Sequence, residues 1–211
     1  EDGSPSRYLC GAAMAFKLIA ALEQQMQGED AQELLLEQYG DLAAIATLAD
    51  VVPLTGENRT LASMGLEVLS HTERPGLQAL AQNAKADLTA CHSDTVSFVL
   101  APRINVTGRI GSVDTAVQLL LTQNDEQAVT LAAEIEKLNA ERRRMEESIS
   151  AEAEELLRRK PLLLHNRILT LVGDDWHLGV IGISAARMVE RYRKPCIVIS
   201  CSDGIARGSA R

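Results

Sequence analysis

Apolar residues recur at about every 3.6 positions along most of the first 160 residues, which is typical of amphipathic helices. The pattern predicts helices over 12–27, 31–38, 60–69, 75–82 and 126–159. Thr60 is the expected N-cap of the third helix, after a turn at 56–59. The last helix meets no Gly or Pro before Pro161, so we expect one rod of about 50 Å. A helix of that length is typical of a connector between two domains.

The pattern changes to short β-branched runs in the last quarter of the chain. Residues 168–172 and 196–200 are predicted strands, and helical spacing over 182–192 lies between them. A strand, a crossover helix and a second strand form a unit with parallel strands. Residues 96–101 are predicted as another short strand or extended run. We therefore expect a helix-rich fold of the α/β class.

The composition is that of a globular chain and excludes intrinsic disorder. Of the 211 residues, 46% are hydrophobic and 24% are charged. No apolar run reaches the ~20 residues that span a bilayer, so we expect no membrane segment. The four cysteines form no CxxC pair, which favours a reducing cytoplasm over a zinc site.

The net charge of −8 is unevenly distributed along the chain. Residues 1–100 carry 5 basic and 14 acidic side chains, whereas residues 161–211 carry 7 basic and 4 acidic ones. An acidic first half is a poor general surface for nucleic acid, so any polyanion site should be local.

The chain begins at Glu1 without Met and stops at Arg211 without a tapering tail, and we expect a fragment of a longer protein.

Asp50 is the one carboxylate in the apolar run 42–54. Burial of an unpaired carboxylate costs several kcal/mol, so Asp50 needs a partner. The spacing alone favours a cap or a structural ion pair over a metal ligand. A two-metal phosphoesterase site needs several converging Asp and His ligands, and the remaining ligands would have to lie upstream.

Residues 101–109 place Arg103 and Arg109 around a predicted Gly-containing turn in an apolar setting. The planar guanidinium group binds phosphate through two parallel hydrogen bonds, and Asn105 would add a donor. Pairing of the arginines with local acidic residues explains the pattern equally well.

Residues 173–182 follow a predicted strand and open a predicted helix, a position where backbone N–H groups and the helix dipole attract anions. His177 lies at this helix start and its role is ambiguous. Trp176 beside it could stack on a base, but a core position is favoured.

The last residues of the chain combine two arginines, a hydroxyl group and a glycine. They are Arg207, Gly208, Ser209 and Arg211. This composition suits a phosphate cradle, although the boundary of an expressed fragment can have the same composition. A third basic run, 142–144 in the long helix, is flanked by glutamates, which favours a solvated helix face.

Several segments match known motifs in order and spacing. They are 9–11 with 15–18, 48–54 with 57–59, 101–105 with 108–109, 176–177 with 179–183 and Arg187, and 208–211. Together they resemble the RecJ family of single-strand-specific 5′ to 3′ DNA exonucleases, within the DHH phosphoesterase superfamily. Leu178 stands where this family often has Pro, and Ala210 stands where Gly is common; both departures look tolerable.

The resemblance implies three parts of an exonuclease core. The end of a DHH catalytic domain would occupy 1–125, a linker helix 126–160, and the start of a DHH-associated domain 161–211. The Asp-His-His motif itself would precede Glu1, and an oligonucleotide-binding fold would follow Arg211.

The resemblance also implies residue roles. Asp50 becomes the last metal-binding carboxylate of the catalytic site, for Mn²⁺ or Mg²⁺, which replaces the cap interpretation. The implied nucleic-acid-binding residues are Arg103, Asn105, Arg109, His177, Gly208, Ser209 and Arg211. Among them, Arg109 would contact DNA phosphate, while Ser209 and Arg211 would grip the 5′ end.

The implied substrate is single-stranded DNA with a 5′ end, hydrolysed in recombination and repair, and the implied partners are a single-stranded-DNA-binding protein and a helicase. With one metal-binding carboxylate, we expect this fragment alone to lack a complete metal site and nuclease activity.

Two alternatives stay open. A non-catalytic DHH-family DNA-binding scaffold would have lost metal ligands, so the presence of Asp50 argues against it. A phosphodiesterase of short oligonucleotides or cyclic dinucleotides should lack Asn105 and its Pro-Arg-Ile-Asn turn.

Overall fold

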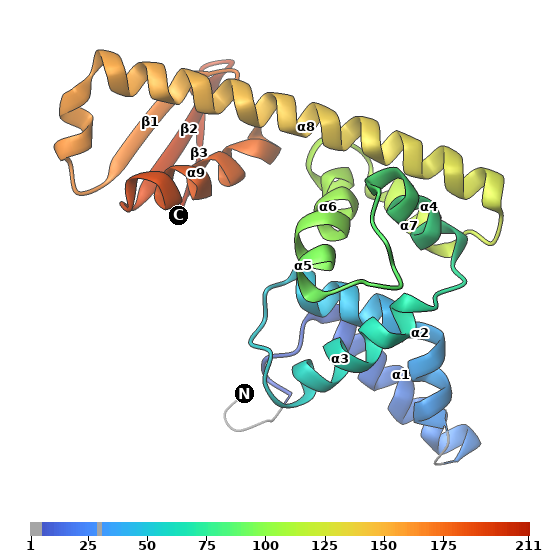
Figure 1. Ribbon diagram of the computed structural model, residues 1–211. Coiled ribbons are helices and arrows are strands. Elements are labelled where there is room, and N and C mark those ends of the chain that lie inside the picture. Colours follow the sequence, from blue (N-terminus) through green and yellow to red (C-terminus); the bar gives the residue numbers. More distant parts are fainter. Residues whose placement is uncertain (1–5, 29–30) are drawn as a thin grey trace. The chain divides into compact units, whose positions relative to one another are not determined.

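The computed structural model describes residues 6–28 and 31–211, and the chain divides into two compact units (Figure 1). The first unit comprises residues 1–105 and 113–136, and the second comprises residues 106–112 and 137–211. Helix α8 contributes its first third to one unit and the rest to the other. The assignment of 1–125, 126–160 and 161–211 to the family's domains therefore stays a prediction.

The described part of the first unit is built from helices. They are α1 (Gly11–Gln27), α2 (Ala31–Ala49), α3 (Gly56–Ser70), α4 (Pro75–Ala84), α5 (Ser93–Thr95), the π-helix η1 (Val96–Leu100), the start of α6 (Ala101–Ile110), α7 (Val113–Leu121) and the start of α8 (Asp125–Arg159). The predicted first helix is confirmed, and Gly28 ends it at φ 99°, a conformation that favours glycine. The helix predicted over 75–82 is also confirmed, with Pro75 in its first turn.

Helix α2 is longer than the pattern predicts, because the apolar run after residue 42 continues it to Ala49. The buried carboxylate in this helix is Asp41, which accepts hydrogen bonds from Thr72 Oγ1 at 2.8 Å and Arg74 Nε at 2.9 Å. Asp50 lies beyond the helix end and is exposed. The expectation that Asp50 is the buried anomaly was therefore wrong.

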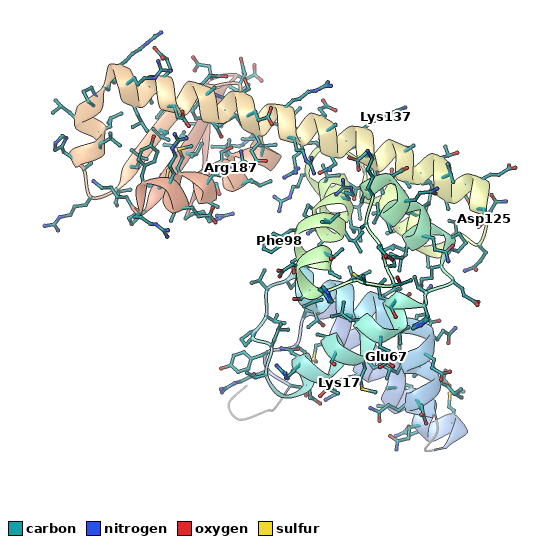
Figure 2. All side chains as sticks on the ribbon, viewed as in Figure 1. Lys17, Glu67, Phe98, Asp125, Lys137 and Arg187 are labelled. Carbon is teal, nitrogen blue, oxygen red and sulfur yellow. The ribbon has the colours of Figure 1, made fainter. Side chains whose placement is uncertain are left out.

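Two local predictions in the first unit were wrong. Helix α3 begins at Gly56 after Thr55, so residues 56–59 form its first turn and Thr60 is not its N-cap. The segment 96–101 is helical, not extended, because it buries Val96 and Leu100 four residues apart and exposes Phe98 between them (Figure 2). A strand would have put all three side chains on one face.

The second unit contains the predicted parallel strand pair. Its further elements are η2 (Pro161–His165), β1 (Leu169–Asp174), α9 (Leu178–Tyr192), β2 (Cys196–Ser202) and β3 (Ile205–Ala210). β1 and β2 are parallel, and β3 adds an antiparallel strand that the sequence pattern did not indicate. One core joins the second half of α8, α9 and one face of the sheet; it includes Ile149, Leu171, Val180, Met188 and Val198.

Helix α8 is a single helix over Asp125–Arg159, which confirms the predicted continuous rod. Acidic residues occupy its first turn and arginines its last, an arrangement that complements the helix dipole. The expected solvated face at 142–144 holds for Arg143 and Arg144, but the Arg142 side chain is only 13% exposed. Across the described ranges, no helix is both long and apolar enough to cross a bilayer.

A substitution at Gly65 tests the packing of the first unit. A Cβ atom there would lie 2.2 Å from the Gly40 carbonyl oxygen of α2, so Gly65→Ala must separate α2 from α3. We expect a loss of about 1–3 kcal/mol in the free energy of unfolding, the usual cost of overpacking. Urea titration followed by circular dichroism measures it. Gly11→Ala is the control, because a Cβ there meets no atom within 4 Å; an equal loss in both variants would contradict the assigned contact.

Candidate nucleic-acid interface

The start of α9 is held in place by its own cap and by the core. The His177 Nδ1 atom accepts a hydrogen bond from the Gly179 backbone N–H at 3.1 Å, so the neutral tautomer protonated at Nε2 caps the helix. Trp176 is buried, and its indole N–H donates to Glu152 Oε2 at 2.8 Å. The core interpretation of Trp176 is thus confirmed, and the exposed His177 lies at the helix end where backbone N–H groups emerge.

Arg109 meets the first turn of α9 from the last turn of α6. Its Nη1 group donates a long hydrogen bond to the Gly179 carbonyl at 3.4 Å. A Cβ on Gly179 would lie 2.3 Å from the Arg109 carbonyl oxygen, so the two backbones approach more closely than any other residue at position 179 would permit. Arg109 is exposed.

Ser209 and Arg211 approach the same helix from β3. The Arg211 Nη1 group donates to Ser209 Oγ at 3.1 Å and to the Ala210 carbonyl at 2.7 Å. A Cβ on Gly182 would lie 2.9 Å from Arg211 Nη2 and 3.1 Å from Ser209 Oγ. The serine and arginine therefore lie over Gly182, one helical turn after the contact of Arg109 with Gly179.

Gly208 does not join this group, because successive residues of a strand point to opposite faces and Ser209 takes the face toward α9. A Cβ on Gly208 would instead crowd Ile199 of β2, 3.2 Å away. The second unit thus brings together four of the residues predicted to bind nucleic acid: Arg109, His177, Ser209 and Arg211.

Two further arginines of the second unit pair with one buried carboxylate. Glu146 of α8 is buried and forms ion pairs with Arg142 (3.4 Å) and Arg187 (3.0 Å). Burial lowers the pKa of the Arg142 guanidinium, and the charges of Arg143, Arg109 and Arg187 lower it further, whereas Glu146 opposes the shift. The sequence pattern did not indicate the role of Glu146, because a glutamate in a charged helix carries no sign that it faces the core.

Arg103 has an internal role in the first unit. Its Nε and Nη2 groups donate to the Glu136 carboxylate at 2.6 and 3.4 Å, and its Nη1 group donates to the Val99 carbonyl at 2.7 Å. The side chain is buried, which favours the interpretation of pairing with a local acid. The predicted turn around it is part of α6, and Asn105 lies exposed on that helix.

Asp50 follows the last residue of α2 and precedes an unusual backbone conformation. Val51 has φ 53° and is 85% exposed. A β-branched residue rarely adopts this left-handed region, and such strain concentrates at functional sites. The loop is held by the buried Asn58, whose Nδ2 group donates to the carbonyls of Pro53 at 3.0 Å and Tyr8 at 2.9 Å. The sequence pattern predicted Asn58 only as part of a turn and gave no sign of this role.

The residues around Asp50 do not form a metal centre by themselves. Within residues 6–28 and 31–211, no group of three or more His, Cys, Asp or Glu side chains is placed to hold an ion. A divalent metal site needs several oxygen or nitrogen ligands. Asp50 is therefore a candidate for one ligand of such a site and not for the whole set.

The second unit has an α/β fold in which Arg109 and Arg211 approach the first two turns of α9, an arrangement that suits the binding of phosphate. No family model matches the chain. The chain is 43% identical over 98% of its length to the single-stranded-DNA-specific exonuclease RecJ of Bacillus subtilis, of which it covers 25%.

Two solved structures of RecJ from Thermus thermophilus are similar to the chain. The complex with Mn²⁺ has a TM-score of 0.78 and 34% identity, over 90% of this chain and 27% of that one. The complex with Mg²⁺ has a TM-score of 0.76 and 32% identity, over 95% of this chain and 30% of that one. The resemblance to RecJ is thereby confirmed over nearly the whole chain, which spans between a quarter and a third of the length of these relatives.

Gly182→Ala tests the contact of α9 with Ser209 and Arg211. The added methyl group meets the flexible end of Arg211, so the fold should persist while the guanidinium is displaced. We expect single-stranded DNA binding to weaken about threefold to tenfold, with an unchanged circular dichroism spectrum, because a displaced guanidinium loses part of a charge-assisted hydrogen bond. Fluorescence anisotropy in the full-length protein measures the affinity. Wild-type affinity in this variant would show that the position of Arg211 over Gly182 does not affect the binding of single-stranded DNA.

Proposed function

We propose that this chain is part of a single-strand-specific 5′ to 3′ DNA exonuclease, to which it contributes a phosphate-binding surface and one metal-binding carboxylate. The observation that carries the proposal is the approach of Arg109 and Arg211 to successive turns of α9, at Gly179 and Gly182. These are the residues that the RecJ resemblance assigns to the DNA backbone and to the 5′ end. The identity of 43% over 98% of the chain supports the same substrate class.

The residues around α9 would bind and orient the strand. Two guanidinium groups and the Ser209 hydroxyl offer charge-assisted donors to phosphate oxygens, and the N-terminus of α9 adds a favourable dipole. His177 caps the first turn of α9. Arg109 approaches this same turn at Gly179. Such preorganised donors would hold the strand in register without rearrangement during turnover.

The proposed cofactor is Mn²⁺ or Mg²⁺, the ions in the RecJ structures that the chain resembles. Such ions activate water and neutralise the charge that develops on the phosphate. We assign Asp50 as one ligand, because the family resemblance implies that role and because the strained Val51 follows it, which supports the proposal. Within residues 6–28 and 31–211, no group of three or more His, Cys, Asp or Glu side chains is placed to complete the site around Asp50.

The proposed partners and location follow from the same function. A single-stranded-DNA-binding protein and a helicase would supply and present the single strand during recombination and repair. The four cysteines are free thiols, which suits a reducing compartment such as the cytoplasm.

Asp50→Asn in the full-length protein tests the proposed metal ligand. We expect turnover to fall by at least a hundredfold, because an amide is a poorer ligand than a carboxylate, while single-stranded DNA affinity stays within about twofold. Nucleotide release and fluorescence anisotropy measure the two quantities. Asp94→Asn is the control, since Asp94 is an exposed carboxylate of the same unit. Wild-type turnover in Asp50→Asn would return Asp50 to a structural role.

Arg211→Ala and Arg109→Ala separate recognition of the 5′ end from general backbone contact. A charge-assisted hydrogen bond is worth roughly 1.5–3 kcal/mol, so Arg211→Ala should reduce cleavage of 5′-phosphorylated strands about tenfold or more, and that of 5′-hydroxyl strands less. Arg109→Ala should reduce both and flatten the salt dependence of binding. The measurement is the ratio of 5′-phosphate to 5′-hydroxyl cleavage. An unchanged ratio in Arg211→Ala would exclude it from end recognition.

A further inference from the structure

Glu146 is a buried carboxylate that joins helices α8 and α9. Its side chain is 3% exposed, and Oε1 lies 3.0 Å from Arg187 Nε, while Oε2 lies 3.4 Å from Arg142 Nη1. Burial of a carboxylate costs several kcal/mol unless charged partners compensate for it. Arg142 is itself mostly buried and provides such compensation from the same helix. The contact with Arg187 is different. Arg187 lies on α9 (Figure 2), and its side chain stays 52% exposed.

The charges around Glu146 do not balance. Two guanidinium groups, those of Arg142 and Arg187, pair with this one buried carboxylate, and the charges of Arg143, Arg109 and Arg187 also act on Arg142. Two buried N–H donors in this region, Arg142 Nε and Asn139 Nδ2, find no acceptor within the described residues. These two donors are buried and out of reach of a ligand, whereas the Arg187 guanidinium, paired with Glu146 and half exposed, can bind an anion that accepts hydrogen bonds.

A neighbouring ion pair between the same two helices lacks these features. Arg191, one turn beyond Arg187 on α9, pairs with Glu154 of α8, and both side chains are substantially exposed. Arg191 also lies over the Tyr192 ring, 5.9 Å from its centroid, and it is not among the charges that act on Arg142. Exposed pairs of this kind contribute about 0–1 kcal/mol and need no ligand.

We propose that Arg187 contacts an internal phosphate of the bound single strand and that Glu146 is the positioning residue that orients Arg187. The hydrogen bond from Arg187 Nε to the buried Glu146 carboxylate fixes the plane of the guanidinium group. About half of the Arg187 side chain remains exposed and open to a phosphate. Arg187 lies eight residues beyond Gly179, about 12 Å along α9 at 1.5 Å per residue. It is therefore placed for a phosphate away from the 5′ terminus, and this inference rests on the proposed exonuclease function.

Arg187→Ala in the full-length protein tests the contact, with Arg191→Ala as the matched control. Binding of an oligothymidine to each protein is followed by fluorescence anisotropy over a series of salt concentrations. The binding constant K falls with salt, and loss of one phosphate contact on a single strand should make the slope of log K against log salt shallower by about 0.7. We expect Arg187→Ala to bind about fivefold to tenfold more weakly at low salt, and Arg191→Ala to match the wild type. An unchanged slope in Arg187→Ala, or equal losses in both variants, would overturn the proposal.

Glu146→Gln tests the positioning role, because it removes the buried charge while the Arg187 charge remains. We expect KM for single-stranded DNA to rise about threefold or more with little change in kcat and in the salt slope, and circular dichroism checks that the fold persists. Arg187→Lys gives the same test without a substitution in the core, since it keeps the charge and loses the Nε contact. A Lys variant with wild-type KM would show that orientation by Glu146 is irrelevant.

The ratio of 5′-phosphate to 5′-hydroxyl cleavage separates this proposal from the function on which it rests. Arg187→Ala should leave that ratio unchanged, because the contact is internal. A changed ratio would assign Arg187 to the 5′ end and overturn the proposal, while leaving the exonuclease function intact. Failure of the unsubstituted full-length protein to bind or cleave single strands would instead overturn the proposed function, and this inference with it.

Discussion

The first turns of α9 carry glycine at the two points where other backbone segments and side chains must come closest. At Gly179 the backbone of α6 approaches so closely that a Cβ would lie 2.3 Å from the Arg109 carbonyl oxygen, and at Gly182 the Ser209 and Arg211 side chains occupy the space of a Cβ. Because atoms cannot overlap, any larger residue at either position would move an arginine away from the helix start. The proposed phosphate surface depends on this absence of side chains as much as on the arginines themselves.

Charge explains how the arginines can stay together at this helix. Guanidinium groups repel one another, and in the second unit the buried Glu146 offsets part of that repulsion for Arg142 and Arg187. Residues 161–211 carry 7 basic and 4 acidic side chains, so this part of the chain keeps a positive excess although the chain as a whole is acidic. A local basic site on an acidic chain favours a polyanion at one place and disfavours non-specific adhesion elsewhere.

Sequence patterns alone determined the features that local chemistry specifies. The unbroken helical period predicted α8, the β-branched runs predicted β1 and β2 as a parallel pair, and Gly28 and Pro161 marked where helices end. The motif order indicated the family, and the residues near α9 were named before their neighbours were known. Each helix period, strand run and motif lies within a short segment, and the order of the segments can be read directly along the chain, so the sequence alone contains this information.

Tertiary structure decided what depends on distant partners. Val96 is β-branched and Leu100 is apolar, so both side chains suit a strand. The segment is nevertheless helical, because it buries Val96 and Leu100 and exposes Phe98 between them. Arg103 and Arg109 look alike in sequence, but Glu136 engages the first and Gly179 lies beside the second. Asp41 rather than Asp50 is buried because Arg74 and Thr72, more than thirty residues away, supply its partners. The cost of burying a charge is decided by what the folded chain places around it, and no spacing within the sequence contains that information.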